Sequence, residues 1–500
     1  MTGAPGGLRL TWVQPEDLVG HELRQAAEDG RDAEPLLRRW LAAGGRPAPA
    51  RAGASADPGP PGLRDLAARL LTELAALPRP SAAAEPSAWP AVAAACVPAP
   101  GPGPIPRPPA EPTGAAPTAT GRTGADGGGG APAGRPAAAG PAWGGSRGGS
   151  DGGLRGRLEA AWVGRAVGCV LGKPVEKLPL EGIRALARAA GNWPLDDWFT
   201  ARGVPPALLA AYPWNRRSAA TSLAENIDGT PEDDDLDYPL LNLLLLRRHG
   251  RRFTTADVGR LWLDELPAGR AFTAERIAYR NLLLGLEPPA TATHHNPFRE
   301  WIGALIRADV HGWTNPGDPR AAAEQAWRDA SLSHTGNGLY AALFAAAAIA
   351  EAASGRADVH TALRAGLAVV PPGARLAEAV RHAIRAARGE RDFDRVVDRL
   401  HARYGHYHWV HSVPNTALVA AALTHADGDF TRSVCRAVSG GWDTDSNGAT
   451  AGSIAALVAG RVPDRWAAPL KNRLATTVAG FDGIGFDTLA RLTAQEAARS

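Results

Sequence analysis

Two short acidic stretches crowd their carboxylates in ways that ordinary surface loops do not. The first, DGTPEDDDLDYP, places Asp233, Asp234 and Asp235 in succession just before a leucine-rich run. The second, GGWDTDSNGATAG, places Asp443 and Asp445 two positions apart among glycines and other small residues. Carboxylates this close repel one another unless a cation, hydrogen-bond donors or open water compensates their charge. Each stretch therefore predicts a site at which a cation or hydrogen-bond donors compensate the negative charge of the carboxylates.

Together the two stretches offer ligands that suit a hard divalent cation. Five carboxylates and the hydroxyl of Ser446 supply oxygen atoms, which Mg²⁺ and Mn²⁺ prefer. Such a set can hold a pair of cations about 3.5–4 Å apart, an arrangement that orients a substrate and activates water. Plainer roles also fit the spacing, because aspartates favour the first turn of a helix and Asp445 or Ser446 can cap one.

The residues around the carboxylates predict how helices position them. Proline suits the first turn of a helix and disfavours helical geometry at the preceding residue, so Pro239 predicts a helix over residues 240–248. The three aspartates would then lie on the loop that leads into this helix. In the second stretch, Gly448 and Gly452 would let the following helix pack close to the site and leave room for cations and a sugar.

The composition divides the chain into three parts. Residues 1–97 carry helical patterns, to which we assign no role, and residues 154–500 show helical periodicity with few β patterns. Between them, residues 98–153 are rich in proline, glycine and alanine, cannot bury a core and are expected to form a disordered linker. We therefore predict an all-α protein with one large C-terminal domain. Its strongest predicted helices are 154–170, 240–248, 319–330, 339–354, 359–370, 376–388, 417–425 and 447–460.

The charge and the cysteines argue against several classes of protein. A formal charge of +3 over 500 residues favours neither a nucleic-acid binder nor a polybasic membrane surface. The three cysteines are widely spaced and predict neither a disulfide framework nor a CxxC metal site. We find no signal peptide, and no apolar run reaches the roughly 18 residues of a membrane span. We expect a cytoplasmic monomer with no nucleic-acid or membrane partner.

Three motifs, in this order, resemble those of the ADP-ribosylglycohydrolase family, which includes dinitrogenase-reductase-activating glycohydrolase and the J1 crystallins. They are GCVLGKPVE at 168–176, DDDLDY at 233–238 and GGWDTDSNGATAG at 440–452, within a resemblance that covers about residues 154–474. The resemblance implies a compact all-α fold with a binuclear Mg²⁺ or Mn²⁺ centre. It also implies hydrolysis of the N- or O-glycosidic bond that joins ADP-ribose to a protein side chain or a small acceptor.

The resemblance further assigns roles to single residues. The family's metal ligands fall on Asp233, Asp234, Asp235, Asp443, Asp445 and Ser446. Glu176 ends the first motif, and we expect Glu176, Asp234 or Asp443 to act as the general base. A histidine that faces the substrate falls on His334. A stretch that lines the ADP-ribose cleft falls on Asn296, Gly303 and Arg307.

The chain departs from the family pattern at three positions. Asp233 stands where the family has a threonine, which adds negative charge and should tighten cation binding. Leu236 replaces a second threonine or serine, and Pro239 stands where a helix former is expected. The substrate and linkage therefore stay open, as do two alternatives: a protein that binds ADP-ribose or a nucleotide without hydrolysis, and a structural crystallin-like protein.

Some of these residues also have purely structural interpretations. His334 fits a hydrogen-bonded core histidine, and Arg307 can pair with Asp309 as readily as with a pyrophosphate. His406 and His408 form an HxH pair that can ligate zinc, but their aromatic neighbours favour a packed, hydrogen-bonded segment.

Overall fold

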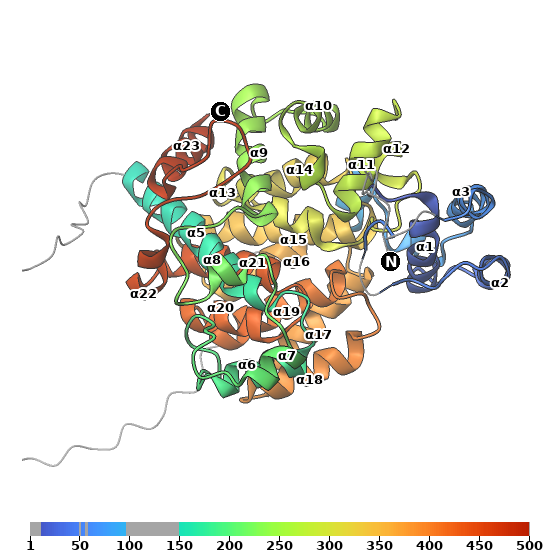
Figure 1. Cartoon of the computed structure of the whole chain (residues 1–500). Coiled ribbons are helices and arrows are strands. Elements are labelled where there is room, and N and C mark those ends of the chain that lie inside the picture. Colours follow the sequence, from blue (N-terminus) through green and yellow to red (C-terminus); the bar gives the residue numbers. More distant parts are fainter. Residues whose placement is uncertain (1–11, 50–51, 56–58, 97–149, 500) are drawn as a thin grey trace, which may run out of the picture.

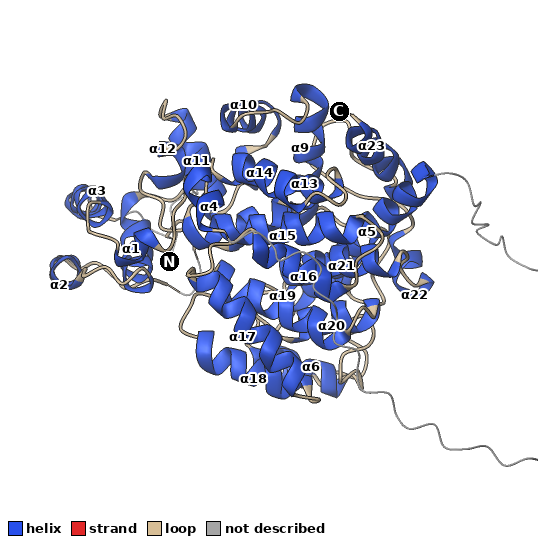
Figure 2. Ribbon diagram, turned by 180° about the vertical axis from the view of Figure 1, so that it is seen from behind, coloured by secondary structure: helices blue, strands red, loops and turns tan. Residues whose placement is uncertain are grey.

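The structure, a computed structural model, describes residues 12–49, 52–55, 59–96 and 150–499 and is built from helices (Figures 1 and 2). Within these ranges the only β pairing consists of three isolated bridges, so the prediction of an all-α protein is confirmed. The predicted linker, residues 98–153, lies outside the described residues except at its end. There, residues 150–153 already belong to a helix, which begins four positions earlier than predicted.

The helices follow one another without intervening strands in the described chain. Those of the N-terminal part are α1 (Pro15–Glu28), α2 (Glu34–Ala42), α3 (Pro61–Ala75), η1 (Pro80–Ala83) and α4 (Trp89–Ala95). The longer helices of the remainder are α5 (Ser150–Gly172), α6 (Leu180–Ala189), α9 (Asp234–His249), α10 (Thr255–Glu265), α11 (Thr273–Leu283), α14 (Pro319–Ala330), α15 (Gly336–Ala353), α16 (Val359–Ala368), α17 (Arg375–Gly389), α18 (Phe393–Tyr404), α19 (Ser412–Ala426), α20 (Phe430–Ser439), α21 (Thr444–Ala459) and α23 (Phe486–Ala498). The short helical segments are η2 (Lys173–Val175), α7 (Pro206–Ala211), α8 (Ala219–Ser222), η3 (Ala268–Arg270), α12 (Ala290–Thr293), η4 (Ile302–Arg307), α13 (Asp309–Trp313), α22 (Asp464–Ala467) and η5 (Ala468–Leu470).

Helix α15 forms the centre of the protein. Every one of its residues except Glu351 is buried, which is why its sequence is apolar on all sides rather than along one stripe. By length and composition it is the one helix of the described chain that would be able to cross a membrane. However, 94% of it lies inside the protein, and central core helices pass the same test.

Helices α5 and α21 lie so close together that their backbones touch (Figure 1). A Cβ atom added at Gly168 would lie 1.9 Å from the carbonyl oxygen of Gly448, and one added at Gly452 would lie 2.0 Å from a carbonyl oxygen of α5. At the end of α5, a Cβ atom added at Gly172 would lie 2.4 Å from the backbone of Thr444, whose hydroxyl donates to the Gly172 carbonyl (2.8 Å). Gly448 and Gly452 therefore allow close packing, as predicted, but they face α5 and do not leave room for a ligand.

Buried charges join the N-terminal part to the rest of the protein. Arg299 donates to Glu22 of α1 (2.8 Å) and to Asp29, the residue that follows this helix (3.0 Å). The next residue, Glu300, is fully buried and accepts from Gln25 of α1 at 3.1 Å as well as from Arg375 at 2.8 Å. A buried charge that loses its partner is strongly destabilising, so these pairs fix α1 against the remainder of the chain. Figure 1 shows the N-terminal helices packed at one side of the protein.

An alanine at position 168 tests the crossing of α5 and α21. We expect Gly168→Ala to lower the free energy of unfolding by about 1–3 kcal/mol, because its methyl group would force the two backbones apart. Gly156 on the same helix is the matched control, since a Cβ atom added there meets nothing within 4 Å. Gly156→Ala should leave stability unchanged or raise it by up to about 1 kcal/mol. Chemical denaturation of both variants gives the comparison, and equal stabilities would contradict the close contact.

Candidate metal centre

The first acidic stretch forms the N-terminus of α9. Asp233 is the N-cap residue, and one oxygen of its carboxylate accepts from the backbone N–H of Asp235 (3.0 Å). The helix begins at Asp234 and continues through Pro239. The prediction that the aspartates lie on a loop before a helix starting at Leu240 is therefore wrong.

Arg165 explains why α9 tolerates Pro239. In a regular helix the N–H of residue 239 would donate to the carbonyl of Asp235, but proline has no N–H. The Nε of Arg165, a fully buried residue of α5, donates to that carbonyl instead (2.7 Å). Its guanidinium also pairs with the carboxylates of Asp235 (3.3 Å) and Asp309 (2.9 Å). Arg165 thus satisfies the carbonyl that the proline leaves without a donor.

The second acidic stretch forms the N-terminus of α21. Asp443 is the N-cap residue, but its carboxylate makes no hydrogen bond to the helix. Instead, the side-chain oxygen of Asn415 accepts from the Asp443 N–H (3.1 Å) and from the amide of Asn447 (2.7 Å). The hydroxyl of Ser446 donates to the carboxylate of Asp235 (3.3 Å) and so links the two acidic stretches. The carboxylate of the cap residue is therefore not used for capping.

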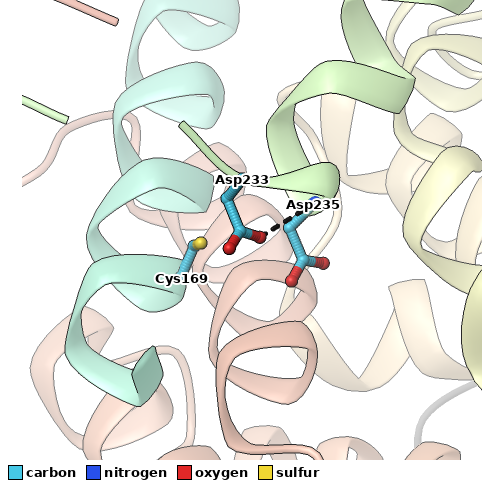
Figure 3. A group of neighbouring side chains, drawn as sticks. All are labelled: Cys169, Asp233 and Asp235. Carbon is cyan, nitrogen blue, oxygen red and sulfur yellow. Dashed lines mark hydrogen bonds between the residues drawn. The ribbon is translucent and has the colours of Figure 1, made fainter. Parts of the chain in front are cut away.

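The ligand atoms of the site fall into two groups, and those within each group lie within 4.8 Å of one another. The members are Cys169, Asp233 and Asp235 in the first group (Figure 3), and Glu176, Asp443 and Asp445 in the second. The structure thus brings together the three motifs that the sequence separates by up to about 270 residues. Burial raises the pKa of the Cys169 thiol well above its usual value, which favours a packed thiol over a thiolate ligand.

Most carboxyls of the site hold their protons more tightly than usual. Burial and then the neighbouring aspartates raise the pKa of Asp234 and Asp235 well above the ordinary value. Burial and the charge of Asp445 do the same to the pKa of Asp443. Burial and the charge of Glu176 raise the pKa of Asp445 to about 7. A divalent cation would relieve this repulsion, so the ligand set fits a hard cation.

Asp233 is the exception because Lys173 lies against it. The Lys173 ammonium forms an ion pair with one Asp233 oxygen, and each side chain is only 9% exposed. Burial raises the pKa of Asp233, but the positive charge of Lys173 outweighs it and holds the pKa below its usual value. The negative charge that Asp233 adds to the site is thus already balanced by a lysine, which opposes the expected tightening of cation binding.

Glu176 lies at the edge of the site, just after η2. The amide of Asn215 donates to one of its oxygens (2.7 Å), and Lys177 pairs with the other (2.6 Å). The sequence reasoning missed Asn215 and Asn415, because isolated asparagines carry no recognisable spacing. A signal did exist for the lysines: the chain has only three, and two of them are Lys173, within the motif that Glu176 ends, and Lys177, directly after it.

Arg307, predicted to contact the substrate, lies in a different buried cluster. It is fully buried and pairs with Glu275 (2.6 Å) and Asp329 (3.2 Å). The alternative partner, Asp309, binds Arg165 instead. His334 is also buried, and its Nε2 lies 3.9 Å from the carboxylate of Glu275. Burial lowers the pKa of His334 well below its usual value, so this histidine is neutral.

Gly303 and Asn296 belong to the same buried region. A Cβ atom added at Gly303 would lie 2.1 Å from an oxygen of Glu275, so glycine is needed for this approach. The amide of Asn296 donates to the carbonyls of Ala292 and Ser333, both at 2.8 Å. The polar atoms of these residues make contacts within the protein, and their role in substrate binding stays a prediction.

The HxH segment has the packed character that its aromatic neighbours favour. His408 is buried and stacks on Trp301 with 4.2 Å between the ring centroids. His406 is exposed and lies over Tyr407. Neither histidine belongs to a group of potential metal ligands among the described residues.

Comparisons with known proteins bear on the whole C-terminal part. The family described as ADP-ribosylglycohydrolase matches residues 150–498, which is well over half of the chain. Among solved structures, 45 chains match. One of them, "ADP-ribosylglycohydrolase-related protein complex", is 20% identical, covers 69% of this chain and 97% of its own, and has a TM-score of 0.43. A search of curated proteins gave no match.

The raised pKa of Asp445 predicts how the stability of the metal-free protein changes with pH. A carboxyl with a pKa of about 7 when folded and 3.8 when unfolded binds its proton more tightly in the folded state. Its contribution to stability therefore falls as the pH rises between those two values. Relative to Asp445→Asn, the metal-free wild type should lose about 1–3 kcal/mol of unfolding free energy between about pH 5 and about pH 8.

Urea denaturation with EDTA at each pH measures this difference. Parallel pH dependences of the two proteins would contradict the raised pKa. Added Mg²⁺ provides the control, because a cation that competes with the proton should stabilise the wild type more than Asp445→Asn at the higher pH.

Proposed function

Because the chain belongs to the ADP-ribosylglycohydrolase family, we propose that it is a metal-dependent hydrolase acting on ADP-ribose conjugates. The bond cleaved would be the glycosidic bond between ADP-ribose and a protein side chain or small acceptor. The observation that carries the proposal is the convergence of two acidic helix N-termini, joined by the Ser446–Asp235 hydrogen bond. Carboxylates with a purely structural role would be paired with arginine or lysine side chains, as Asp235 and Asp233 are. Asp234, Asp443 and Asp445 form no such ion pair among the described residues.

Two Mg²⁺ or Mn²⁺ ions are the proposed cofactors. The residues that would hold them are Asp233, Asp234, Asp235, Asp443, Asp445 and Ser446. When bound, such cations stabilise negative charge on substrate oxygens and lower the pKa of a bound water. The support lies in the ligand set itself: the carboxyls are crowded, and burial and then the charge of neighbouring carboxylates raise the pKa of Asp234 and Asp443, an effect that a bound cation would oppose.

Glu176 is the residue we assign as general base. Its carboxylate lies with those of Asp443 and Asp445, and hydrogen bonding from Asn215 holds its orientation. Held in this way, it can take a proton from a water that attacks the anomeric carbon. Asp234 and Asp443 remain alternatives for this step. The surrounding carboxylates would stabilise the positive charge that develops on the ribose as the bond breaks.

The departures from the family pattern do not interrupt the site. Leu236 is fully buried in α9, and Pro239 is buried in the same helix. The missing N–H of Pro239 is compensated by Arg165, so the aspartates keep their place at the helix N-terminus. Asp233 and Asp235, and Asp443 and Asp445, therefore stay grouped despite both changes, whereas Asp234 joins neither group. This grouping supports a metal centre over a vestigial site.

Removing single carboxylates tests the proposed hydrolase. We expect Asp443→Asn and Asp234→Asn each to lower the rate of Mg²⁺-dependent ADP-ribose release by at least about 100-fold, because each removes a proposed ligand. Asp237→Asn is the matched control: Asp237 is buried in the same helix, but it accepts hydrogen bonds from Thr476 and Thr477. The measurement is ADP-ribose released from arginine- and serine-linked substrates.

The alternatives give different results in the same assay. Calorimetric binding of ADP-ribose without release over hours would indicate a binding protein. A purified protein without bound metal by elemental analysis, and without Mg²⁺-dependent release, would indicate a structural role. An equal loss of activity in Asp237→Asn would show that the effect of Asp234→Asn comes from disturbing α9.

A further inference from the structure

We propose, building on the metal centre proposed above, that Lys173 competes with a cation for Asp233 and makes the two cation positions unequal in affinity. Lys173 would then be an affinity-determining residue of the site without being a ligand. The position formed by Glu176, Asp443 and Asp445 would bind tightly, and the position formed by Asp233 and Asp235 weakly.

Both oxygens of Asp233 are already used within the protein. Oδ1 accepts from the backbone N–H of Asp235, and Oδ2 pairs with the Lys173 ammonium. The first bond caps α9, so it is part of the helix start. A cation at this position would therefore have to displace Lys173 from Oδ2 or bind beside its positive charge.

The fold holds Lys173 in this place. It follows directly after Gly172, whose close contact with the backbone of Thr444 fixes the end of α5. Its side chain is 9% exposed, and the ammonium also donates to the carbonyl of Glu232 (3.4 Å). A lysine confined in this way does not swing into water as an exposed one does.

The second group of carboxylates lacks such a confined cation. Asp443 and Asp445 form no ion pair within the described residues. Lys177 pairs with Glu176, but its side chain is 41% exposed and can exchange its carboxylate partner for water. In the first group, by contrast, Lys173 pairs with Asp233 and the buried Arg165 pairs with Asp235 (3.3 Å). The two groups thus differ in the negative charge that is left unbalanced, and Lys173 is the partner that lies against a proposed ligand oxygen of Asp233.

Binding of Mn²⁺ to the metal-free full chain tests this inference. Electron paramagnetic resonance and calorimetry should show two classes of site with different affinities in the wild type. Lys173→Met should raise the affinity of the weaker class by about tenfold or more, because it removes a positive charge from a buried position while keeping the side chain's length. Asp233→Thr alone should weaken the same class by about tenfold, because Lys173 is then left unpaired beside the cation.

The double variant Asp233→Thr/Lys173→Met completes the cycle. It should bind Mn²⁺ at the weaker class more tightly than Asp233→Thr does, because both charges of the pair are gone. Circular dichroism confirms the fold of each variant. If Lys173→Met does not fold, the comparison of Asp233→Thr with the double variant decides, and equal affinities overturn the inference.

The control variant Asp445→Asn separates this inference from the proposed function. It should weaken the tighter class whatever residue stands at position 173. If Asp445→Asn weakens binding and a folded Lys173→Met leaves it unchanged or weaker, only the role of Lys173 is overturned. If the wild type binds no Mn²⁺, both the metal centre and the role of Lys173 are overturned.

Discussion

The backbone contact between α5 and α21 is the constraint on which the site depends. Because glycines face each other along the crossing, the end of α5 lies directly against the first turn of α21. The segment that leaves α5 carries Lys173 and Glu176, and the turn it meets carries Asp443 and Asp445. Gly448 and Gly452 therefore affect the candidate site indirectly: they set the distance between two elements that each hold part of the proposed ligand set.

Charge balance distinguishes two kinds of buried carboxylate in this protein. Asp309 and Glu300 are held by Arg165 and Arg375, and these pairs join elements of the fold. Asp443 and Asp445 are equally buried but have no such partner among the described residues. Keeping them uncharged, or charged without a cation, costs stability that a purely structural residue would not need to lose. The lack of an ion-pair partner therefore distinguishes the carboxylates of the proposed metal centre better than burial alone does.

The sequence alone predicted the helical class and most helix positions, and α14 has the predicted bounds. It also predicted that the acidic motifs belong together, because their residue types and the resemblance both pointed to one centre. It placed the start of α9 wrongly, because the rule for proline is local while the compensating donor, Arg165, lies about 70 residues away. Lys173 was seen only as part of a motif, since its pairing with Asp233 depends on how α5 and α9 pack.

The charged pairs between α1 and the later helices bear on what counts as the folding unit. Similarity to the family begins at residue 150, so a recombinant fragment cut by homology would begin there. Such a fragment would keep Arg299 and lose both of its carboxylate partners, Glu22 of α1 and Asp29 directly after it. An arginine evolved for the interior would then face solvent or a neighbouring molecule. The part of the chain that matches the family and the part that shares its buried charge pairs thus have different boundaries.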